Sequence, residues 1–232
     1  MAKYKMVRAM ERSYGGTRSL DKVKYIVLHY TGNDSRTDTA KAECHFFAHG
    51  NQRNAGAHFF VDQYGLVLQS IPMKRIAWSV GGFFTLENGA GKYYKKCLNA
   101  NSVSIEMCDC ASRDPSPAMT EAIIELIKYI QSKCPNAKTV IRHFDVNGKC
   151  CPARFAGANN ARWKKFRETI TGAKQISTVT PAKTKSKKKS NTEIAKEVIN
   201  GKWGNGDARK KKLKAAGYDP SEIQKLVNKM LK

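Results

Sequence analysis

The sequence lacks any apolar run long enough to cross a membrane, and no apolar stretch follows its charged start, Met1–Lys5. A membrane-spanning helix needs about 20 consecutive apolar residues, and a secretion signal needs an apolar core behind its charged start. The sequence therefore predicts no membrane span and contains no conventional secretion signal. We expect a protein that is made in a cytoplasm.

Acidic residues are scarce: the chain has 19 Asp and Glu against 42 Lys and Arg, so its formal net charge is +23. Such a surface attracts polyanions, among them nucleic acid, anionic lipid and the anionic polymers of bacterial cell walls. The chain has no recognisable DNA- or RNA-binding motif, and no basic stretch is interleaved with aromatic residues that stack on bases. We therefore expect no specific nucleic-acid partner, and anionic wall polymers stay open as partners.

A disulfide framework is also missing. The seven cysteines are odd in number, and Cys150 and Cys151 are adjacent in the sequence. Their spacing is not that of a small disulfide-rich domain, and thiols stay reduced in a cytoplasm. Five cysteines are predicted to be small buried apolar residues: Cys44, Cys97, Cys108, Cys110 and Cys134. The sequence does not decide whether any of the seven pair.

Residues 1–172 have the pattern of one α/β domain. Short apolar and β-branched runs predict strands, and an alternating stretch around a central turn predicts a hairpin. Apolar residues at spacings of three and four predict helices. The predicted strands and hairpin cover residues 23–30, 57–68, 102–108 and 139–142. The predicted helices cover residues 37–48, 119–132 and 161–171.

The composition changes after residue 172. Residues 173–189 are rich in Ser, Thr and Lys, which predicts an extended basic linker. Residues 190–232 contain three helix starts: a capping box at Ser190–Glu193, a capping Asp207, and Asp219 followed by a proline. We therefore predict a three-helix module with a small apolar core. Its predicted core residues are Ile194, Val198, Ile199, Leu213, Ile223, Leu226, Val227 and Leu231.

Two distant segments carry residues that commonly bind zinc. His29 ends an apolar run, whereas His143 follows the predicted strand 139–142 and is separated from Cys151 by a predicted turn at 145–148. Zinc prefers nitrogen and sulfur ligands, and a catalytic zinc site uses three protein ligands and leaves one position for water. His29, His143 and Cys151 form such a set, which indicates a zinc hydrolase. Taken alone, His29 is more often a hydrogen-bonded core residue.

Four motifs, in this order along the chain, resemble those of the type-2 N-acetylmuramoyl-L-alanine amidases. They are Tyr25–Thr31, Ala57–Phe59, Ser102–Glu106 and the segment from His143 through Lys149 to Pro152. That family shares its fold with peptidoglycan recognition proteins and phage endolysins, so the resemblance implies an α/β fold with a mixed central sheet flanked by helices. It also implies Zn²⁺ as the cofactor, held by His29, His143 and Cys151.

The resemblance implies roles for two further residues. Glu106 matches the family's catalytic carboxylate, which takes a proton from the attacking water and returns it to the departing amine. Lys149 matches a lysine that stabilises the tetrahedral oxyanion. The residues alone leave open a solvent-facing strand glutamate and a plain turn lysine. Several relatives have a tyrosine where this chain has Ala57, and because Glu106 is present we still expect activity.

The tail resembles the wall-binding repeat of Cpl-seven-type phage lysins, present here once. The resemblance rests on Glu193–Ala195, Gly201–Gly206, Arg209 and Ala216–Asp219. Trp203 and Tyr218 offer flat rings to a sugar, and Arg209 offers a fork to a carboxylate. Alternatively, the two aromatic rings form the core of the small module. In the first domain, His58 lies on a strand of the predicted hairpin, where it could line the cleft, and it is a candidate for contact with substrate.

The sequence therefore predicts a peptidoglycan hydrolase of the phage-endolysin type that cuts the amide between N-acetylmuramic acid and L-alanine. The predicted parts are an amidase domain at 1–172, a linker at 173–189 and a wall-binding repeat at 190–232. We expect it to act on the cell wall after release from the host cytoplasm. A non-catalytic wall-binding protein is the main alternative, and the complete set of site residues argues against it. A cytoplasmic wall-recycling amidase is another, and the tail argues against that.

Overall fold

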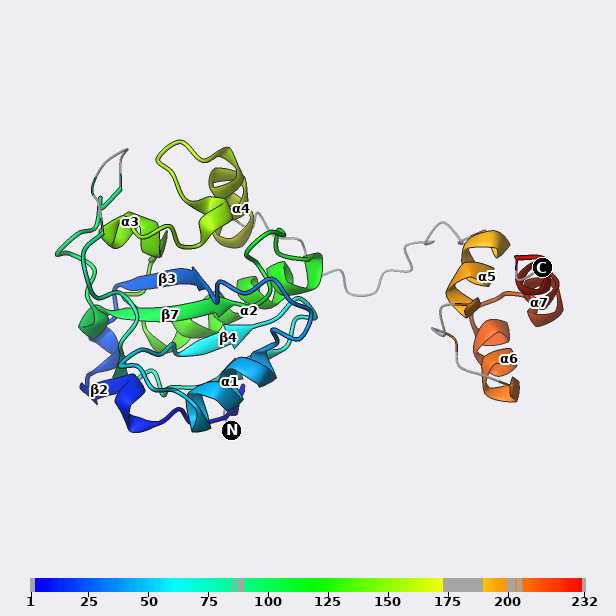
Figure 1. The fold of residues 1–232 in the computed structure, drawn as a ribbon, viewed down its shortest axis with the longest axis horizontal. Coiled ribbons are helices and arrows are strands. Elements are labelled where there is room, and N and C mark those ends of the chain that lie inside the picture. Colours follow the sequence, from blue (N-terminus) through cyan, green and yellow to red (C-terminus); the bar gives the residue numbers. More distant parts are fainter. Residues whose placement is uncertain are drawn as a thin grey trace. The chain divides into compact units, whose positions relative to one another are not determined.

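The computed structural model describes residues 3–84, 86, 90–172, 190–199, 203 and 206–230. The chain divides into two compact units, Met1–Gln175 and Ile176–Lys232, each of which has its own core (Figure 1). Among the described residues, no helix combines the length and the apolar character that crossing a membrane requires. The predicted linker 173–189, most of the loop 200–205, and Leu231 lie outside the described residues.

The first unit is built on a six-stranded mixed sheet. In spatial order, its strands are β1 (Lys5–Met6), β5 (Val67–Gln69), β4 (Phe59–Val61), β7 (Ser102–Met107), β3 (Tyr25–Tyr30) and β8 (Thr139–Arg142). The strands β4, β7, β3 and β8 run parallel, and β5 is antiparallel to β4 and parallel to β1. A separate ribbon pairs β2 (Tyr14–Thr17) with β6 (Arg75–Ala77).

Helices cover both faces of this sheet (Figure 1). The helices α2 (Pro117–Lys133) and α4 (Ala161–Thr171) pack on one face, and α1 (Ala40–His49) packs on part of the other. Side chains alternate between the faces of a strand. In β3, Ile26 and Leu28 therefore join the core under α2, whereas Val27 and His29 point to the opposite face. The fold places His29 on the face that α2 does not cover.

The structure confirms the predicted strands, hairpin and helices of this unit, with shifted ends. Short 3-10 helices also occur at Glu11–Ser13, Leu20–Lys22, Asn99–Asn101 and Ala153–Phe155. The short strands β1, β2 and β6 were not predicted. The predicted turn at 145–148 is wrong, because the helix α3 (His143–Asn147) occupies most of it. The carboxylate of Asp145 accepts the main-chain N–H of Arg142 at 2.8 Å and so caps this helix.

The five cysteines predicted to be buried are buried, as is Cys151, whereas Cys150 is exposed. All seven are free thiols. The buried cysteines therefore act as small apolar residues. Cys151 differs from the others because it is also a candidate metal ligand.

The second unit contains α5 (Asn191–Ile199), α6 (Gly206–Ala215) and α7 (Pro220–Met230). Ser190 and Glu193 form the predicted capping box, since the main-chain N–H of each bonds to the side chain of the other. Asp219 accepts the N–H of Ser221 at 2.8 Å and caps α7 as predicted. The core of the unit consists of Ile194, Ala195, Val198, Leu213, Tyr218, Ile223 and Val227.

Two details of the second unit differ from the predictions. The helix α6 begins at Gly206, so Asp207 lies inside its first turn instead of capping it, and its carboxylate pairs with Lys210 at 3.0 Å. Ile199 ends α5 and is exposed, because the other apolar residues of that helix already fill the core.

Candidate metal centre and active site

The candidate site lies at the carboxyl ends of three parallel strands. In the register of β3 and β7, His29 stands opposite Glu106, so both side chains project from the same face of the sheet. The neighbouring strand β8 ends at Arg142, opposite Leu28, which brings the next residue, His143, beside His29. Parallel strands gather their carboxyl ends at one edge, where α/β folds commonly place ligand sites.

The structure brings the three predicted metal ligands together. One ring nitrogen of each histidine and the sulfur of Cys151 all lie within 4.8 Å of one another, and all three residues are buried. The Cys151 sulfur is 3.8 Å from Nδ1 of His29, and the two imidazole rings are 4.6 Å apart between centroids. In a tetrahedral zinc site, such donors are separated by about 3–4 Å. The donors of the cluster are therefore close enough together to hold one metal ion after a small adjustment of their side chains.

The hydrogen bonding of the two imidazoles also fits a metal. Nε2 of His29 and both ring nitrogens of His143 are buried, and none has a hydrogen-bond partner among the described residues. Buried polar atoms without partners are costly and need an explanation. A divalent cation between His29, His143 and Cys151 would bind one nitrogen of each ring and so account for part of this set, since imidazole nitrogen and thiolate are donors that zinc prefers.

The protonation states of these ligands follow from burial. Burial, followed by the charge of Lys149, lowers the pKa of His143 to about 3. Burial, followed by the nearby His143, holds the pKa of His29 well below its ordinary value. Both imidazoles are therefore neutral at physiological pH, as metal binding requires. Burial and the Glu106 carboxylate raise the pKa of the Cys151 thiol, so its ionisation needs the positive charge of a cation.

Hydrogen bonds around α3 fix the positions of His143 and Cys151. The main-chain carbonyl of Cys151 accepts the N–H of Phe144 at 2.9 Å, which ties the two ligand-bearing segments together. The chain reverses at Gly148, whose φ of 80° suits glycine, because other residues rarely adopt positive φ. The segment from His143 to Cys151 therefore consists of the short helix α3 followed by a turn at Gly148.

The buried guanidinium of Arg142 holds the backbone around this region in place. It forms an ion pair with Asp145 at 2.6 Å and donates further hydrogen bonds to the main-chain carbonyls of Phe155 and Gly157. These contacts join the end of β8 to the segment that follows the second metal ligand. Arg142 therefore holds the backbone on both sides of the cluster.

Replacing Arg142 with methionine is expected to destabilise the first unit by roughly 3 kcal/mol, because the half-buried carboxylate of Asp145 and the carbonyls of Phe155 and Gly157 would lose their buried partner. Arg162, whose ion pair with Asp114 is exposed, is the matched control. Arg162→Met should change the free energy of unfolding by less than about 1 kcal/mol. Urea unfolding measures the change in the free energy of unfolding of both variants. Equal changes would contradict the structural role of Arg142.

Glu106 is the predicted catalytic carboxyl group, and it lies on the same face of the sheet as His29. Its oxygen Oε2 is buried and has no hydrogen-bond partner among the described residues. Burial raises the pKa of this carboxyl to about 8; the charge of Lys149 lowers it, and Glu43 and Asp38 raise it. A carboxyl with a pKa near neutrality can both accept and return a proton.

This raised pKa predicts how stability depends on pH in protein stripped of metal. The pKa of Glu106 rises from 4.5 to about 8 on folding, so protonation favours the folded state. The stabilisation is complete below about pH 4.5 and disappears as the pH rises through 8. Glu106→Gln should therefore stabilise the metal-free protein by roughly 2–4 kcal/mol at pH 8.5 and by little at pH 4.5. Urea unfolding at the two pH values checks this, and an equal gain at both would contradict it.

Lys149 and a pocket of about 440 Å³ lie beside the cluster. Lys149 and His143 both line the pocket, and the ammonium of Lys149 is 5.8 Å from the ring centroid of Phe84. Its charge acts on His29, His143 and Glu106, whose pKa values it lowers. The structure thus places the predicted Lys149 at the open side of the metal-ligand cluster.

His58, the predicted substrate contact of the first unit, is fully buried. Its Nδ1 accepts the N–H of Ser104 at 3.1 Å, and its Nε2 lies 3.1 Å from both the Arg75 carbonyl and the Arg18 guanidinium. Burial lowers its pKa to about 3. In this structure His58 is therefore packed inside the core, with no exposed face for a ligand.

The predicted binding residues of the second unit are distributed between core and groove. Tyr218 is buried in the three-helix core, and the ring of Trp203 packs edge-on against it with 6.3 Å between centroids. Arg209 donates to Gln224 at 2.7 Å. A groove of about 1040 Å³ is lined by Arg209 and Tyr218, among others. The rings of Trp203 and Tyr218 both contribute to the core, which agrees with the alternative interpretation given for them. Arg209 lines an open groove.

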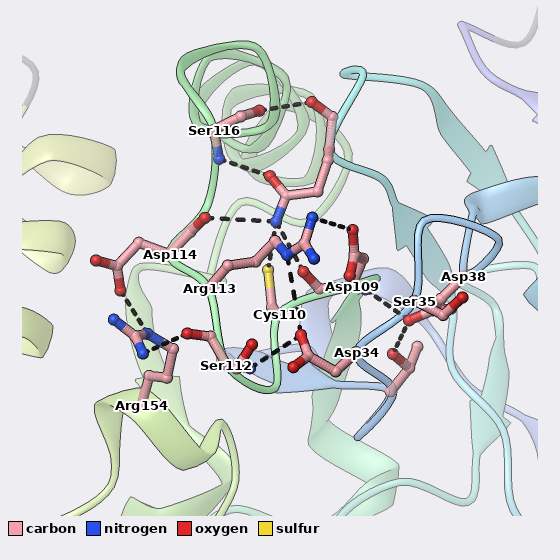
Figure 2. Close-up of polar contacts among 12 residues, drawn as sticks. Asp34, Ser35, Asp38, Asp109, Cys110, Ser112, Arg113, Asp114, Ser116 and Arg154 are labelled. Atoms are coloured by element: carbon pink, nitrogen blue, oxygen red, sulfur yellow. Dashed lines mark hydrogen bonds and ion pairs between the residues drawn. The ribbon is translucent and has the colours of Figure 1, made fainter.

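Sequence analysis missed a polar network that orders the rim of the site (Figure 2). Asp38, in the loop after β3, accepts the N–H of Asp109, which follows β7, and the hydroxyl of Thr31, each at 2.5 Å. In the same loops, Asp34 accepts the N–H of Ser112 at 3.2 Å. No sequence motif marks these residues, because their pairing depends on β3 and β7 being neighbours.

The network extends to the segment after Cys151. Arg154 donates to the carboxylate of Asp114 at 2.8 Å and to the main-chain carbonyl of Ser112 at 2.5 Å. Figure 2 shows these residues facing one another across three segments of the chain. The loops after β3, β7 and the cysteine ligand are therefore joined by one continuous set of hydrogen bonds.

Comparison with known families gives two matches. The N-acetylmuramoyl-L-alanine amidase family model matches residues 19–154, and the CW_7 repeat model matches residues 192–231. The first match contains all four motifs noted in the first unit. The second covers the three helices of the second unit except Asn191, the first residue of α5.

Two curated proteins are similar to parts of the chain. N-acetylmuramoyl-L-alanine amidase CwlH of Bacillus subtilis (strain 168) is 27% identical over 149 residues, which are 64% of this chain and 53% of that protein. The lysozyme of Streptococcus phage Cp-7 is 54% identical over 42 residues, which are 18% of this chain and 12% of that protein. The chain thus spans about half the length of the first relative and a small part of the second.

A solved structure shares the fold of the first unit. The mutant endolysin from Bacillus subtilis superposes with a TM-score of 0.55 at 24% sequence identity, over 73% of this chain and 99% of that one. At this identity, the likeness establishes the mixed α/β fold with its sheet flanked by helices.

Proposed function

Because the chain belongs to the N-acetylmuramoyl-L-alanine amidase family, we propose that it is a zinc-dependent peptidoglycan amidase of the endolysin type. Its substrate would be the amide that joins the lactyl group of N-acetylmuramic acid to L-alanine. The observation that carries the proposal is the convergence of His29, His143 and Cys151, with Glu106 on the same face of the sheet. Such a set is suited to hydrolysis of an amide.

In this proposal, His29, His143 and Cys151 hold the zinc ion. Their buried nitrogens without partners and their mutual distances support that role. Two neutral imidazoles and one thiolate leave the site with a net charge near +1 when a divalent ion is present. Bound there, zinc supplies a Lewis acid that acidifies water and polarises the scissile carbonyl.

Glu106 is proposed as the general base and acid. It stands opposite His29 in the strand register, and a carboxyl with a raised pKa is able to accept a proton from the attacking water. It then returns the proton to the departing amino group of alanine. This transfer makes the amine a neutral leaving group and restores the carboxylate for the next cycle.

Lys149 is proposed to stabilise the oxyanion of the tetrahedral intermediate. Its ammonium lines the pocket together with His143, and a fixed positive charge there favours developing negative charge. Since Lys149 is exposed, the bound substrate itself would shield the ammonium from water and strengthen the interaction.

The second unit is proposed as a wall-binding module. Its match to the CW_7 repeat and its open groove support this role, with Arg209, Tyr218 and Trp203 as the proposed contact residues. We assign residues 1–172 to catalysis, 173–189 to a linker and 190–232 to binding. Tethering raises the effective concentration of the catalytic unit at the polymer, and the net charge of +23 favours anionic walls. The protein would act on the wall after release from the host cytoplasm.

Digestion of purified bacterial cell wall tests the proposal. The amidase should release new alanine amino groups and no new reducing sugar ends. The appearance of reducing ends without amino groups would identify a glycosidase and overturn the assignment. Binding to the wall without any release of amino groups would identify a non-catalytic wall-binding protein.

A further inference from the structure

Some of the residues that line the pocket beside the metal-ligand cluster have no role in the proposed mechanism. His143 and Lys149 line it, and its other lining residues include Trp78, Ser79, Asn54 and Asn99. The first two residues belong to the chemistry at the scissile amide. The remaining wall is therefore free to contact another part of the same substrate.

The side chain of Asn99 is held in one orientation. Its oxygen Oδ1 accepts two main-chain N–H groups, from Ser79 at 3.0 Å and from Val80 at 2.8 Å. Two donors on one atom identify that atom as the oxygen, because an amide nitrogen cannot accept them. The nitrogen Nδ2 has no hydrogen-bond partner anywhere in the described part of the chain. Asn99 therefore presents an oriented donor at the pocket wall.

The main chain of Asn99 is fixed as well. Arg18, which is 8% exposed, donates to the carbonyl of Asn99 at 2.8 Å and to the carbonyl of Met73 at 3.1 Å. The guanidinium of Arg18 also touches the buried ring of His58. Because a buried arginine anchors its backbone, Asn99 is placed by the core of the fold and its donor is preorganised.

Trp78 gives the same wall an apolar surface. Its side chain is 37% exposed, and it immediately precedes Ser79, to which Asn99 is bonded. The ring lies directly on the backbone of Gly15, where a Cβ atom would come within 2.4 Å of Cζ2. Since any larger residue at position 15 would displace the ring, the β2 backbone holds it at the pocket.

We propose that Asn99 is a specificity-determining residue whose Nδ2 donates to the acetamido carbonyl oxygen of the N-acetylated sugar, with the acetyl methyl group against Trp78. This inference rests on the proposed function. In a muramoyl residue, the acetamido group is on the ring carbon next to the one that carries the lactyl ether. An acetamido oxygen is therefore a few bonds from the scissile carbonyl, within a pocket of about 440 Å³ that His143 and Asn99 both line. An acetamido group also combines the acceptor and the methyl group that this wall complements.

The experiment compares two synthetic muramoyl-peptide substrates, one with the acetamido group and one with a neutral hydroxyl in its place. The zinc-loaded wild type should cleave the acetamido substrate with a kcat/KM roughly tenfold higher. Asn99→Asp keeps an oxygen for the N–H groups of Ser79 and Val80 and removes the donor, so its ratio should fall close to one. Asn54→Asp places the same charge in the same pocket and should keep the wild-type ratio.

Three results would overturn the inference. They are equal rates on both substrates by the wild type, a tenfold ratio in folded Asn99→Asp, or a lost ratio in Asn54→Asp. Thermal unfolding establishes that the variants fold, and Asn99→Ala, which also removes the donor, replaces the aspartate variant if that one does not. A wild type that cleaves neither substrate removes the proposed function and this inference together, whereas equal cleavage of both removes the inference alone.

Discussion

Replacing Glu106 with glutamine is expected to lower the rate of amide hydrolysis by roughly 10²- to 10⁴-fold while the zinc content of the protein stays unchanged. Glutamine has nearly the shape of glutamate, so the face shared with His29 is preserved. It cannot accept a proton from water or return one to the amine. The loss should therefore fall on kcat, with little change in KM.

Release of alanine amino groups from cell wall measures this rate, and elemental analysis measures the zinc. Glu121, an exposed glutamate on α2, gives the matched control, since Glu121→Gln removes the same charge away from the site. Full activity in the Glu106 variant would remove that residue from the mechanism. Loss of zinc in the Glu106 variant would instead assign the carboxylate a role in holding the metal.

Replacing Cys151 with serine is expected to abolish zinc binding at stoichiometric levels and to reduce activity by more than about 100-fold. Changes in the groups that merely support a ligand already cost about 10- to 100-fold, and serine removes the ligand itself. A chelator should inactivate the wild type in the same way. Added zinc should restore the wild type and leave the variant inactive.

The adjacent thiol offers a control at the same place in the chain. Cys150 is exposed, whereas Cys151 is buried beside His29. Cys150→Ser should therefore keep its zinc and its activity. Full zinc content in both variants would show that neither sulfur is a ligand and would contradict the proposed centre.

The candidate metal ligands were accessible to sequence reasoning because each lies at a recognisable position in the sequence. His29 ends an apolar strand, and His143 follows another strand at a fixed distance from Cys151. The structure brings these three together. Their convergence depends on β3 and β8 being neighbours in the sheet, and apolar periodicity does not encode that pairing. The resemblance to a family supplied it.

Other residues were out of reach for physical reasons. Arg18 and Asn99 matter through main-chain contacts over long separations in sequence, which leave no local pattern. His58 was ambiguous for a different reason. Alternation along β4 turns His58 and Phe59 to opposite faces, but both faces of that central strand are covered, so both side chains are buried. Alternation distinguishes inside from outside only where one face meets water.

The shared hydrogen bonds around Asp38, Asp109 and Arg154 bear on how this part of the molecule opens. Segments that hold one another by common bonds lose them together, and such groups exchange their amide protons as one cooperative unit. The loops after β3 and β7 and the stretch beyond the cysteine ligand should thus take up deuterium at a common rate. A bound cation would slow that rate for all three at once.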